Sequence, residues 1–193
     1  MAIKGLPKFR CLGCAYCCFF SEEWESPVIF PWEKRILEEL GAWYGAQLEF
    51  KPLEIFGDEE GKCVAVVYKW VIKGFCPFYS ILSRSCKIHE YKPLACKMYP
   101  LLINLSSAEI IASAKCKWVK ERSSAIRLLG REELLRHVLP KEYRALRQAF
   151  MIYTTLVESL NRRGFYRIND PSHCASMIEL EDALKGAGHG REA

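Results

Sequence analysis

Apolar residues recur at every third or fourth position in the last third of the chain. This period predicts one long helix that begins at Pro140 and stops at Gly164, with a single apolar stripe along it. The residues of the stripe are Tyr143, Leu146, Phe150, Tyr153, Val157 and Leu160. We expect the stripe to pack into a core and assign it no role in chemistry. A short helix is also predicted near residues 131–138.

A further helix is predicted to begin at Pro31, because proline suits the first turn of a helix. Gly41 supplies a stop signal. The apolar face between these two residues comprises Trp32, Ile36, Leu37 and Leu40. The sequence therefore predicts a short amphipathic helix over residues 31–41.

Runs rich in β-branched and aromatic residues predict strands in the middle of the chain. These runs are residues 63–68, 70–72, 101–105 and 110–112. The first follows a polar turn at residues 57–61, and the last two flank Ser106 and Ser107. Residues 75–100 are expected to be irregular, because Pro77, Pro93 and Pro100 interrupt them.

Together these elements predict an α+β fold, in which a small irregular cysteine-rich metal-binding core with short strands is followed by packed C-terminal helices. We expect one domain over residues 1–170, with the cysteine core at about residues 8–120 and the helical part at about residues 121–165. Residues 171–193 are expected to form a C-terminal tail.

Length and composition limit the class of protein. The chain has 193 residues, of which 50% are hydrophobic, enough for one compact core. No run approaches the roughly 18 apolar residues of a membrane helix, and the N-terminal segment does not resemble a signal peptide. We therefore expect a cytoplasmic protein with no membrane partner.

The net charge of +5 is distributed unevenly along the chain. Residues 115–167 carry 13 Lys or Arg against 5 Asp or Glu, whereas residues 1–114 balance at 13 against 13. The basic block could attract an acidic partner or nucleic acid. A solvated helix surface is the favoured interpretation, because core-like residues are interleaved with the charges. We expect weak, non-specific binding of nucleic acid at most.

Cysteine is the most informative residue type in this chain. Four of the ten cysteines lie within eight residues, at Cys11, Cys14, Cys17 and Cys18. Four more follow at Cys76, Cys86, Cys96 and Cys116. Disulfides are disfavoured in a reducing compartment, so the sequence predicts that these eight thiols bind metal. Eight thiolates suffice for two four-sulfur sites.

The spacing of the first three cysteines resembles the loop that holds three corners of a [4Fe–4S] cluster in bacterial ferredoxins. The fourth corner often comes from a remote cysteine followed by proline, as at Cys76–Pro77. Adjacent residues project in different directions, so Cys17 and Cys18 are expected to serve different centres. One partition places Cys11, Cys14, Cys17 and Cys76 at one site and Cys18, Cys86, Cys96 and Cys116 at the other. A partition in which the two sites exchange one cysteine fits the sequence almost as well.

Zinc is the direct alternative, because four thiolates also form a closed tetrahedral zinc site. Zinc sites usually show two separate pairs of cysteines, whereas here the first segment holds four and the others are spread widely. This asymmetry favours an iron–sulfur centre, and we expect one or two clusters of the [4Fe–4S] type. A single binuclear site shared by the eight thiols is a third arrangement.

Four other residues have side chains that can bind a metal. Cys63 begins a predicted strand and is expected to be a small buried hydrophobe, and Cys174 is expected to be a free thiol. His89, three residues after Cys86, is the best candidate for a ligand other than cysteine. His137 falls in a predicted helix and is assigned no role.

The motif C-x2-C-x2-C-C at residues 11–18, the Cys76–Pro77–Phe78 segment and the run from Cys86 to Pro100 resemble the CxxCxxCC family. Its members are YkgJ-like cysteine cluster proteins, described as zinc- or iron-chelating domains. The resemblance covers roughly residues 8–120. The family usually has Arg–Pro where this chain has Lys92–Pro93, and phenylalanine at Tyr99. The resemblance implies that the cluster positions are seven cysteines, Cys11, Cys14, Cys17, Cys18, Cys76, Cys86 and Cys96. By the same logic Cys116 is the eighth.

The resemblance leaves the activity open. Some relatives are labelled iron–sulfur oxidoreductases, and others resemble a flagellin lysine methylase. The chain has no Gly-rich loop that would hold a methyl donor or a dinucleotide. We expect a metal-binding protein with a cysteine-ligated iron–sulfur centre that serves electron transfer or a redox step with a protein partner. The alternatives are a zinc-stabilised binding module without catalysis, and a metal chelator or carrier.

Overall fold

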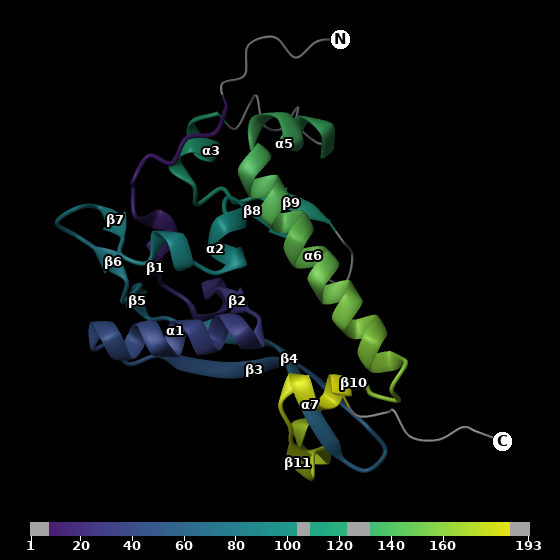
Figure 1. Cartoon of the computed structure of the whole chain (residues 1–193). Coiled ribbons are helices and arrows are strands. Elements are labelled where there is room, and N and C mark those ends of the chain that lie inside the picture. Colours follow the sequence, from purple (N-terminus) through teal and green to yellow (C-terminus); the bar gives the residue numbers. More distant parts are fainter. Residues whose placement is uncertain (1–7, 104–108, 123–131, 186–193) are drawn as a thin grey trace. The chain divides into compact units, whose positions relative to one another are not determined.

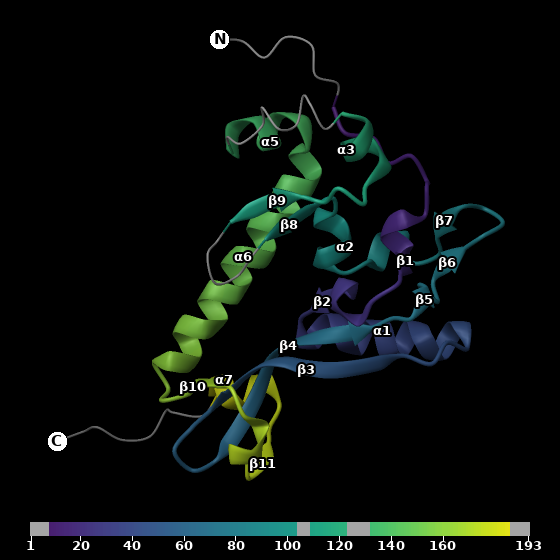
Figure 2. The ribbon, with the colours of Figure 1, turned by 180° about the vertical axis from the view of Figure 1, so that it is seen from behind.

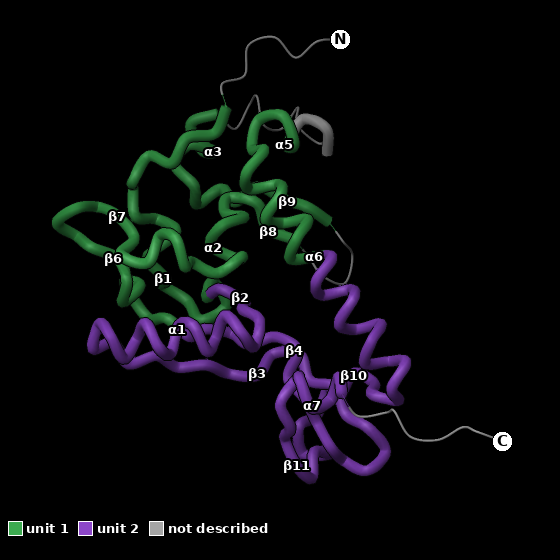
Figure 3. The backbone as a smooth tube through the Cα atoms, viewed as in Figure 1, with its two compact units in different colours: residues 1–26, 72–150 green, residues 27–71, 151–193 purple. Residues whose placement is uncertain are grey.

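The computed structural model describes residues 8–103, 109–122 and 132–185, and it confirms the predicted α+β class. The chain forms two compact units (Figure 3). Unit 1 comprises residues 1–26 and 72–150, and unit 2 comprises residues 27–71 and 151–193. Each unit is therefore built from two separate stretches of sequence. The turn predicted at Ser106 and Ser107 lies outside the described residues.

Unit 2 is organised around a five-stranded sheet. Strands β3 (Glu49–Gly57) and β4 (Lys62–Val71) form a long antiparallel hairpin (Figure 1). Strand β10 (Tyr166–Ile168) pairs with β3, and β2 (Val28–Ile29) pairs with β4, both antiparallel. Strand β11 (Ser176–Met177) adds a parallel partner to β4. The sheet thus joins residues from both stretches of unit 2.

The hairpin turns where the sequence predicts it. The side chain of Asp58 accepts hydrogen bonds from the backbone N–H groups of Glu60 at 3.0 Å and Lys62 at 2.9 Å. Gly61 adopts a positive φ of 79°, which favours glycine. The two strands predicted after this turn are one continuous strand, β4, whose residues 63–67 are all buried.

Helix α1 (Pro31–Tyr44) packs along this hairpin (Figures 1 and 2). It begins at the predicted proline, where the Glu33 carboxylate caps the backbone N–H of Phe30 at 3.0 Å. It continues past Gly41, because the left-handed residue that ends it is Gly45. Leu37 is buried, whereas Ile36 is 40% exposed, so the buried face is rotated from the predicted one.

The segment predicted to be a C-terminal tail is part of unit 2 as far as residue 185. Helix α7 (Leu180–Lys185) buries Leu180 and Ala183 and contacts β4. A disulfide joins Cys63 to Cys174, with Cα atoms 5.5 Å apart. Cys63 is fully buried, as expected, but it is covalently paired, and Cys174 is not the free thiol that the sequence predicted.

Unit 1 contains three short antiparallel pairs. Strand β1 (Phe19–Phe20) pairs with β5 (Gly74–Phe75), β6 (Tyr79–Ser80) with β7 (Ser85–Cys86), and β8 (Leu101–Ile103) with β9 (Ile110–Ala112). Its short helices are α2 (Leu94–Met98), α3 (Lys117–Glu121) and α5 (Glu132–Val138). Helix α6 (Pro140–Asn161) contributes residues to both units, and it matches the predicted long helix.

The packed core of unit 1 is aliphatic and aromatic. It comprises Leu101, Cys116, Trp118, Val119, Leu135, Val138, Leu139, Tyr143 and Leu146. Of the eight free cysteines only Cys116 is buried, and the others are half-buried or exposed. The thiols therefore lie beside this core instead of forming it. No helix in the described part of the chain is long and apolar enough to cross a membrane.

Candidate metal centre

All eight free cysteines belong to unit 1, whereas the disulfide belongs to unit 2. The free thiols are Cys11, Cys14, Cys17, Cys18, Cys76, Cys86, Cys96 and Cys116. They are the eight candidate ligands that the sequence identifies. The thiols that could bind a metal and the two cysteines that form the disulfide therefore belong to different units.

The first cysteine segment is a tight loop. Gly13 and Ala15 both adopt positive φ values, 58° and 65°. Ala15 then precedes a 3-10 turn over Tyr16–Cys18, in which its carbonyl oxygen accepts a hydrogen bond of 2.8 Å from the Cys18 N–H. A left-handed alanine is costly and is found where surrounding structure imposes it. This turn brings the sulfurs of Cys17 and Cys18 to 3.8 Å.

The separation of these two sulfurs has a direct chemical meaning. Two thiolates that bind one tetrahedral ion at about 2.3 Å hold their sulfurs about 3.8 Å apart. In a [4Fe–4S] cluster each cysteine binds a different iron, so the sulfurs lie farther apart. The sulfurs of Cys17 and Cys18 lie 3.8 Å apart, and the expectation that they serve different centres stays a prediction.

The backbone joins the second cysteine segment to the first. The Cys76 N–H donates a 2.7 Å hydrogen bond to the carbonyl oxygen of Cys18. This bond continues the β1–β5 pair, in which Phe19 lies opposite Phe75. Two cysteines that are remote in sequence are thereby fixed as backbone neighbours.

Cys76 and Cys86 are connected through a turn and a hairpin. The Tyr79 N–H donates to the carbonyl oxygen of Cys76 at 2.9 Å, and Tyr79 lies opposite Cys86 in the β6–β7 pair. Burial raises the pKa of Cys76 to about 11, while the backbone N–H groups of Phe78 and Tyr79 oppose this rise. Those N–H groups favour the thiolate, because they donate hydrogen bonds to its sulfur.

The same arrangement recurs at two other cysteines. Burial raises the pKa of Cys86, and the N–H of Ile88 opposes the rise. Burial also raises the pKa of Cys116, and the backbone N–H groups of Val119 and Trp118 lower it. In each case the donor lies two or three residues after the cysteine. Backbone N–H groups directed at sulfur orient and stabilise metal-bound thiolates.

Four thiols form one electrostatically coupled group: Cys17, Cys76, Cys86 and Cys96. Burial raises the pKa of Cys96, and the charges of the other three raise it further. Beyond the effect of burial, Cys86 and Cys17 raise the pKa of Cys76, and Cys17 raises that of Cys86. Every pair within the group is therefore close enough for the two charges to interact.

A second group consists of Cys14 and Cys116, with Cys17 common to both groups. In addition to burial, the charges of Cys14 and Cys17 raise the pKa of Cys116. Tyr99 lies near the same thiols: burial raises its pKa, and the charges of Cys116, Cys17 and Cys14 add to the rise. Because Cys17 interacts with both groups, the two groups lie side by side.

One cation lies among the thiols of the first group. Burial raises the pKa of Cys86 and Cys96, and the ammonium group of Lys92 opposes both shifts. Lys92 also opposes the rise at Cys17, which is mainly caused by the hydrogen bond to Cys18. A cation at this position compensates thiolate charge.

An ion pair joins the first cysteine segment to the last one. The Lys115 ammonium lies 2.9 Å from the Glu25 carboxylate and donates to the carbonyl oxygen of Phe19 at 2.7 Å. Lys115 precedes Cys116, and Phe19 follows Cys18. This contact holds the two cysteine segments together. The sequence did not predict the ion pair, and the lysine beside Cys116 was its only signal.

The grouping differs from the partition expected from the sequence. Cys17 associates with Cys76, Cys86 and Cys96, while Cys14 associates with Cys116. The donor set suits metals that prefer thiolate. Within the described ranges, no three His, Cys, Asp or Glu side chains are already arranged to hold one metal ion. Binding would therefore require the side chains to converge from their present positions.

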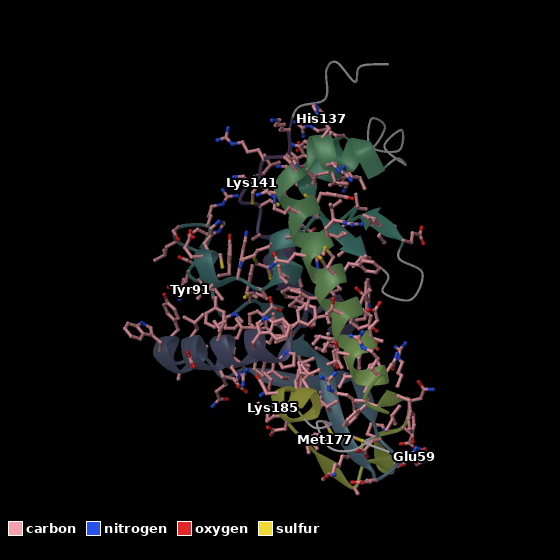
Figure 4. The ribbon with its side chains drawn as sticks, turned by 45° about the vertical axis from the view of Figure 1, so that its right-hand side comes forward. Glu59, Tyr91, His137, Lys141, Met177 and Lys185 are labelled. Atoms are coloured by element: carbon pink, nitrogen blue, oxygen red, sulfur yellow. A yellow bond between two sulfur atoms is a disulfide. The ribbon has the colours of Figure 1, made fainter. Side chains whose placement is uncertain are left out.

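The remaining candidates lie at the surface. Cys11 is exposed. His89 is exposed in a 3-10 turn that ends at Tyr91, whose side chain is also exposed (Figure 4). His137 and Lys141 lie exposed at the junction of α5 and α6 (Figure 4). Lys141 belongs to the basic block of residues 115–167, so part of this block is solvated as expected.

Comparison of the chain with known protein families, with curated proteins and with solved structures finds no match. The resemblance to the CxxCxxCC family stays a prediction from the cysteine motif.

Proposed function

We propose that unit 1 holds a cysteine-ligated metal centre, and that the protein transfers electrons or supports a redox step. One observation carries the proposal: cysteine segments remote in sequence meet, because the Cys76 N–H donates a 2.7 Å hydrogen bond to the carbonyl oxygen of Cys18, whose sulfur lies 3.8 Å from that of Cys17. Uncompensated thiolates repel one another, so a cation or a cluster would stabilise this arrangement. When bound, an iron–sulfur cluster supplies one-electron redox chemistry.

Cys11, Cys14, Cys18 and Cys116 would provide the ligands of a second centre beside the first. Support comes from the interaction of Cys14 with Cys116 and from the ion pair of Lys115 with Glu25, which holds their segments together. Cys17 interacts with thiols of both sets, which also suits a binuclear site. The proposal is thus one or two clusters, with these eight cysteines as ligands.

Zinc is the second candidate, and a specific distance favours it. The 3.8 Å between the sulfurs of Cys17 and Cys18 equals the spacing of two thiolates on one tetrahedral ion. A zinc-filled unit 1 would be a structural module that binds a partner and catalyses nothing. If unit 1 instead bound its metal weakly and released it to other proteins, the protein would be a metal carrier.

We place the protein in the cytoplasm and in the CxxCxxCC family. Eight free thiols favour a reducing compartment, whereas the Cys63–Cys174 disulfide favours an oxidising one, so the location rests on the expectation from the sequence. The spacing of Cys11, Cys14, Cys17 and Cys18 supports the family. An oxidoreductase activity belongs to the proposal only if the centre proves to be redox-active.

The test is metal and acid-labile sulfide analysis of protein purified without oxygen, combined with its visible spectrum. An iron–sulfur centre predicts brown protein with iron and sulfide in similar amounts. Colourless protein with stoichiometric zinc, after cluster reconstitution has failed, would replace the redox proposal with the zinc module. Protein that holds neither iron nor zinc, both after anaerobic purification and after reconstitution, would refute the metal centre itself.

A further inference from the structure

An exposed apolar surface lies around the first cysteine loop. The exposed large apolar side chains of this part of unit 1 are Leu12, Tyr16, Phe19, Phe75, Ile81 and Leu82. Ile81 is 70% exposed and Leu82 is 100% exposed. They stand at the tip of the β6–β7 hairpin, which projects from unit 1 in both views (Figures 1 and 2). Grouped exposed apolar residues of this kind mark interaction sites.

Aromatic rings give this surface a defined pocket. The rings of Phe19 and Phe75 meet edge to face, with centroids 5.0 Å apart, and Tyr79 stacks on Phe75 at 5.6 Å. Beside them lies a pocket of about 310 Å³ lined by Cys14, Ala15, Tyr16, Phe19, Phe75 and Lys115. The pocket therefore opens directly onto one of the candidate ligand thiols.

The hairpin tip and the cysteine loop lie in contact. A Cβ atom built on Gly13 would lie 3.5 Å from the carbonyl oxygen of Arg84. The tip itself is ordered by two hydrogen bonds, from the Ser83 N–H to the Ser80 hydroxyl at 3.2 Å and between the hydroxyls of Ser83 and Ser85 at 2.7 Å. The hairpin tip thus lies against the loop that carries Cys14, a residue that lines the pocket.

This surface carries a positive charge that the overall balance conceals. Residues 8–26 and 73–92, together with the pocket residue Lys115, contain seven Lys or Arg and four Glu, a net charge of +3. One of these acids, Glu25, is paired with Lys115. The basic residues are Lys8, Arg10, Lys73, Arg84, Lys87, Lys92 and Lys115.

We propose that this surface docks an acidic protein partner, which inserts an apolar side chain into the pocket over Cys14. An apolar centre surrounded by charge is the usual anatomy of a protein interface, with aromatic residues contributing most of the affinity. Opposite charges steer the two proteins together and fix their orientation. The inference rests on the proposed function, because the partner would exchange electrons or metal with the thiols beneath the pocket.

A protein fits these features better than a lipid surface does. The pocket is half-open and three of its six lining residues are aromatic, so it suits one side chain of a partner laid against the rings. Its lysine wall is also fixed, because Lys115 is held by Glu25 at 2.9 Å and by the Phe19 carbonyl at 2.7 Å. A bilayer would instead engage the hairpin tip alone and leave the pocket empty.

The test uses the full chain as purified, with its metal content measured in every preparation. The probes are a short dye-labelled peptide with one tryptophan among glutamates, the same peptide with lysines in place of glutamates, and phosphatidylglycerol vesicles. Binding of the peptides is followed by fluorescence anisotropy at two salt concentrations. The variants are Leu82→Ser, Tyr16→Ser and Lys73→Glu, and Trp43→Ser is the control, since Trp43 is 84% exposed but belongs to unit 2.

We expect the acidic peptide to bind with a Kd on the order of 0.1 mM, more weakly at high salt, and the basic peptide not to bind. Each of the three variants should weaken binding by at least about fivefold, whereas Trp43→Ser should leave it unchanged. Equal binding of both peptides, or no effect of Leu82→Ser and Tyr16→Ser, would overturn the proposal. Vesicle binding without peptide binding would assign the surface to lipid and overturn it as well.

The two proposals can fail separately. Protein that holds metal but does not bind the acidic peptide would refute the docking surface and leave the metal centre standing. Metal-free protein that binds the peptide as described would refute the proposed function and leave a docking surface without a metal beneath it.

Discussion

The backbone N–H of Cys76 donates a 2.7 Å hydrogen bond to the carbonyl oxygen of Cys18, which fixes two distant cysteine segments against each other. The bond prolongs the pairing of Phe19 with Phe75. The ligand-bearing segments are therefore positioned by backbone pairing. A side-chain substitution at Cys76 can consequently remove a ligand without removing this hydrogen bond.

The first prediction follows from the coupled group of four thiols. Cys76→Ser should remove most of the metal from the first centre, because Cys76 interacts with Cys17, Cys86 and Cys96. Cys11→Ser should cost less, because Cys11 is exposed and its loss leaves that group intact. Metal content per chain, measured on both variants prepared side by side, checks the difference. Equal losses would show that the grouping is wrong.

The second prediction concerns stability. Metal-binding energy is also folding energy wherever the site does not exist in the unfolded chain. Cys96→Ser should therefore lower the thermal transition of metal-replete protein by several degrees, while the neighbouring Ala95→Ser should change it little. If Cys96→Ser loses metal but unfolds at the unchanged temperature, unit 1 folds without its metal.

The third prediction concerns acid stability. The pKa of Glu25 is lowered to about 2, chiefly by its hydrogen bond from Lys115 and further by the N–H and hydroxyl of Ser21. A carboxylate with a lowered pKa stabilises the fold fully above its ordinary pKa of 4.5, and this contribution disappears as the pH falls toward 2.

Glu25→Gln should therefore destabilise the protein at neutral pH, and it should flatten the loss of stability between pH 4.5 and 2. Chemical denaturation across this range provides the measurement. Glu59→Gln, in the exposed turn of unit 2 (Figure 4), is the matched control and should change neither quantity. Parallel pH profiles for Glu25→Gln and the unmodified chain would contradict the assignment.

The fourth prediction concerns the disulfide of Cys63 and Cys174, which lie 111 residues apart. The residues between them include 72–150, which form most of unit 1. Closing a loop of this size restricts the unfolded chain by about 4 to 5 kcal/mol in the chain-entropy description.

Cys174→Ala should therefore lower the unfolding transition of unit 2 markedly, and a dithiol reductant should do the same to the unmodified chain but not to the variant. Alkylation under denaturing, non-reducing and metal-free conditions should modify eight cysteines. Modification of all ten would show that the bond does not form.

Long periodic elements could be predicted from the sequence, and short paired ones could not. The stripe from Tyr143 to Leu160 specified α6, and the β-branched run with its Asp58 turn specified β4. Strand β3 was missed because Pro52 and interspersed charges weaken its pattern, and its register shifts between Pro52 and Glu54. It forms because it pairs with β4, which is information that local sequence does not contain.

The candidate ligands could be named from the sequence, but their grouping could not. The direction of the Cys17 and Cys18 side chains depends on a 3-10 turn after a left-handed Ala15, which no local preference predicts. The pairing of Cys63 with Cys174 depends on the strand β11, which brings the C-terminal segment beside β4. Both features depend on tertiary structure. The free thiol predicted at Cys174 is wrong, whereas the division of the other eight cysteines between centres stays a prediction.

X-ray absorption spectroscopy of the anaerobically purified protein tests the central claim most directly, because it reports the atoms bound to the metal. Thiolate ligation predicts about four sulfur neighbours per metal at about 2.3 Å. A second shell of iron would identify a cluster, and its absence from a zinc spectrum would identify the structural site. A shell dominated by oxygen and nitrogen would contradict the account, because it would place the metal away from the eight thiols of unit 1.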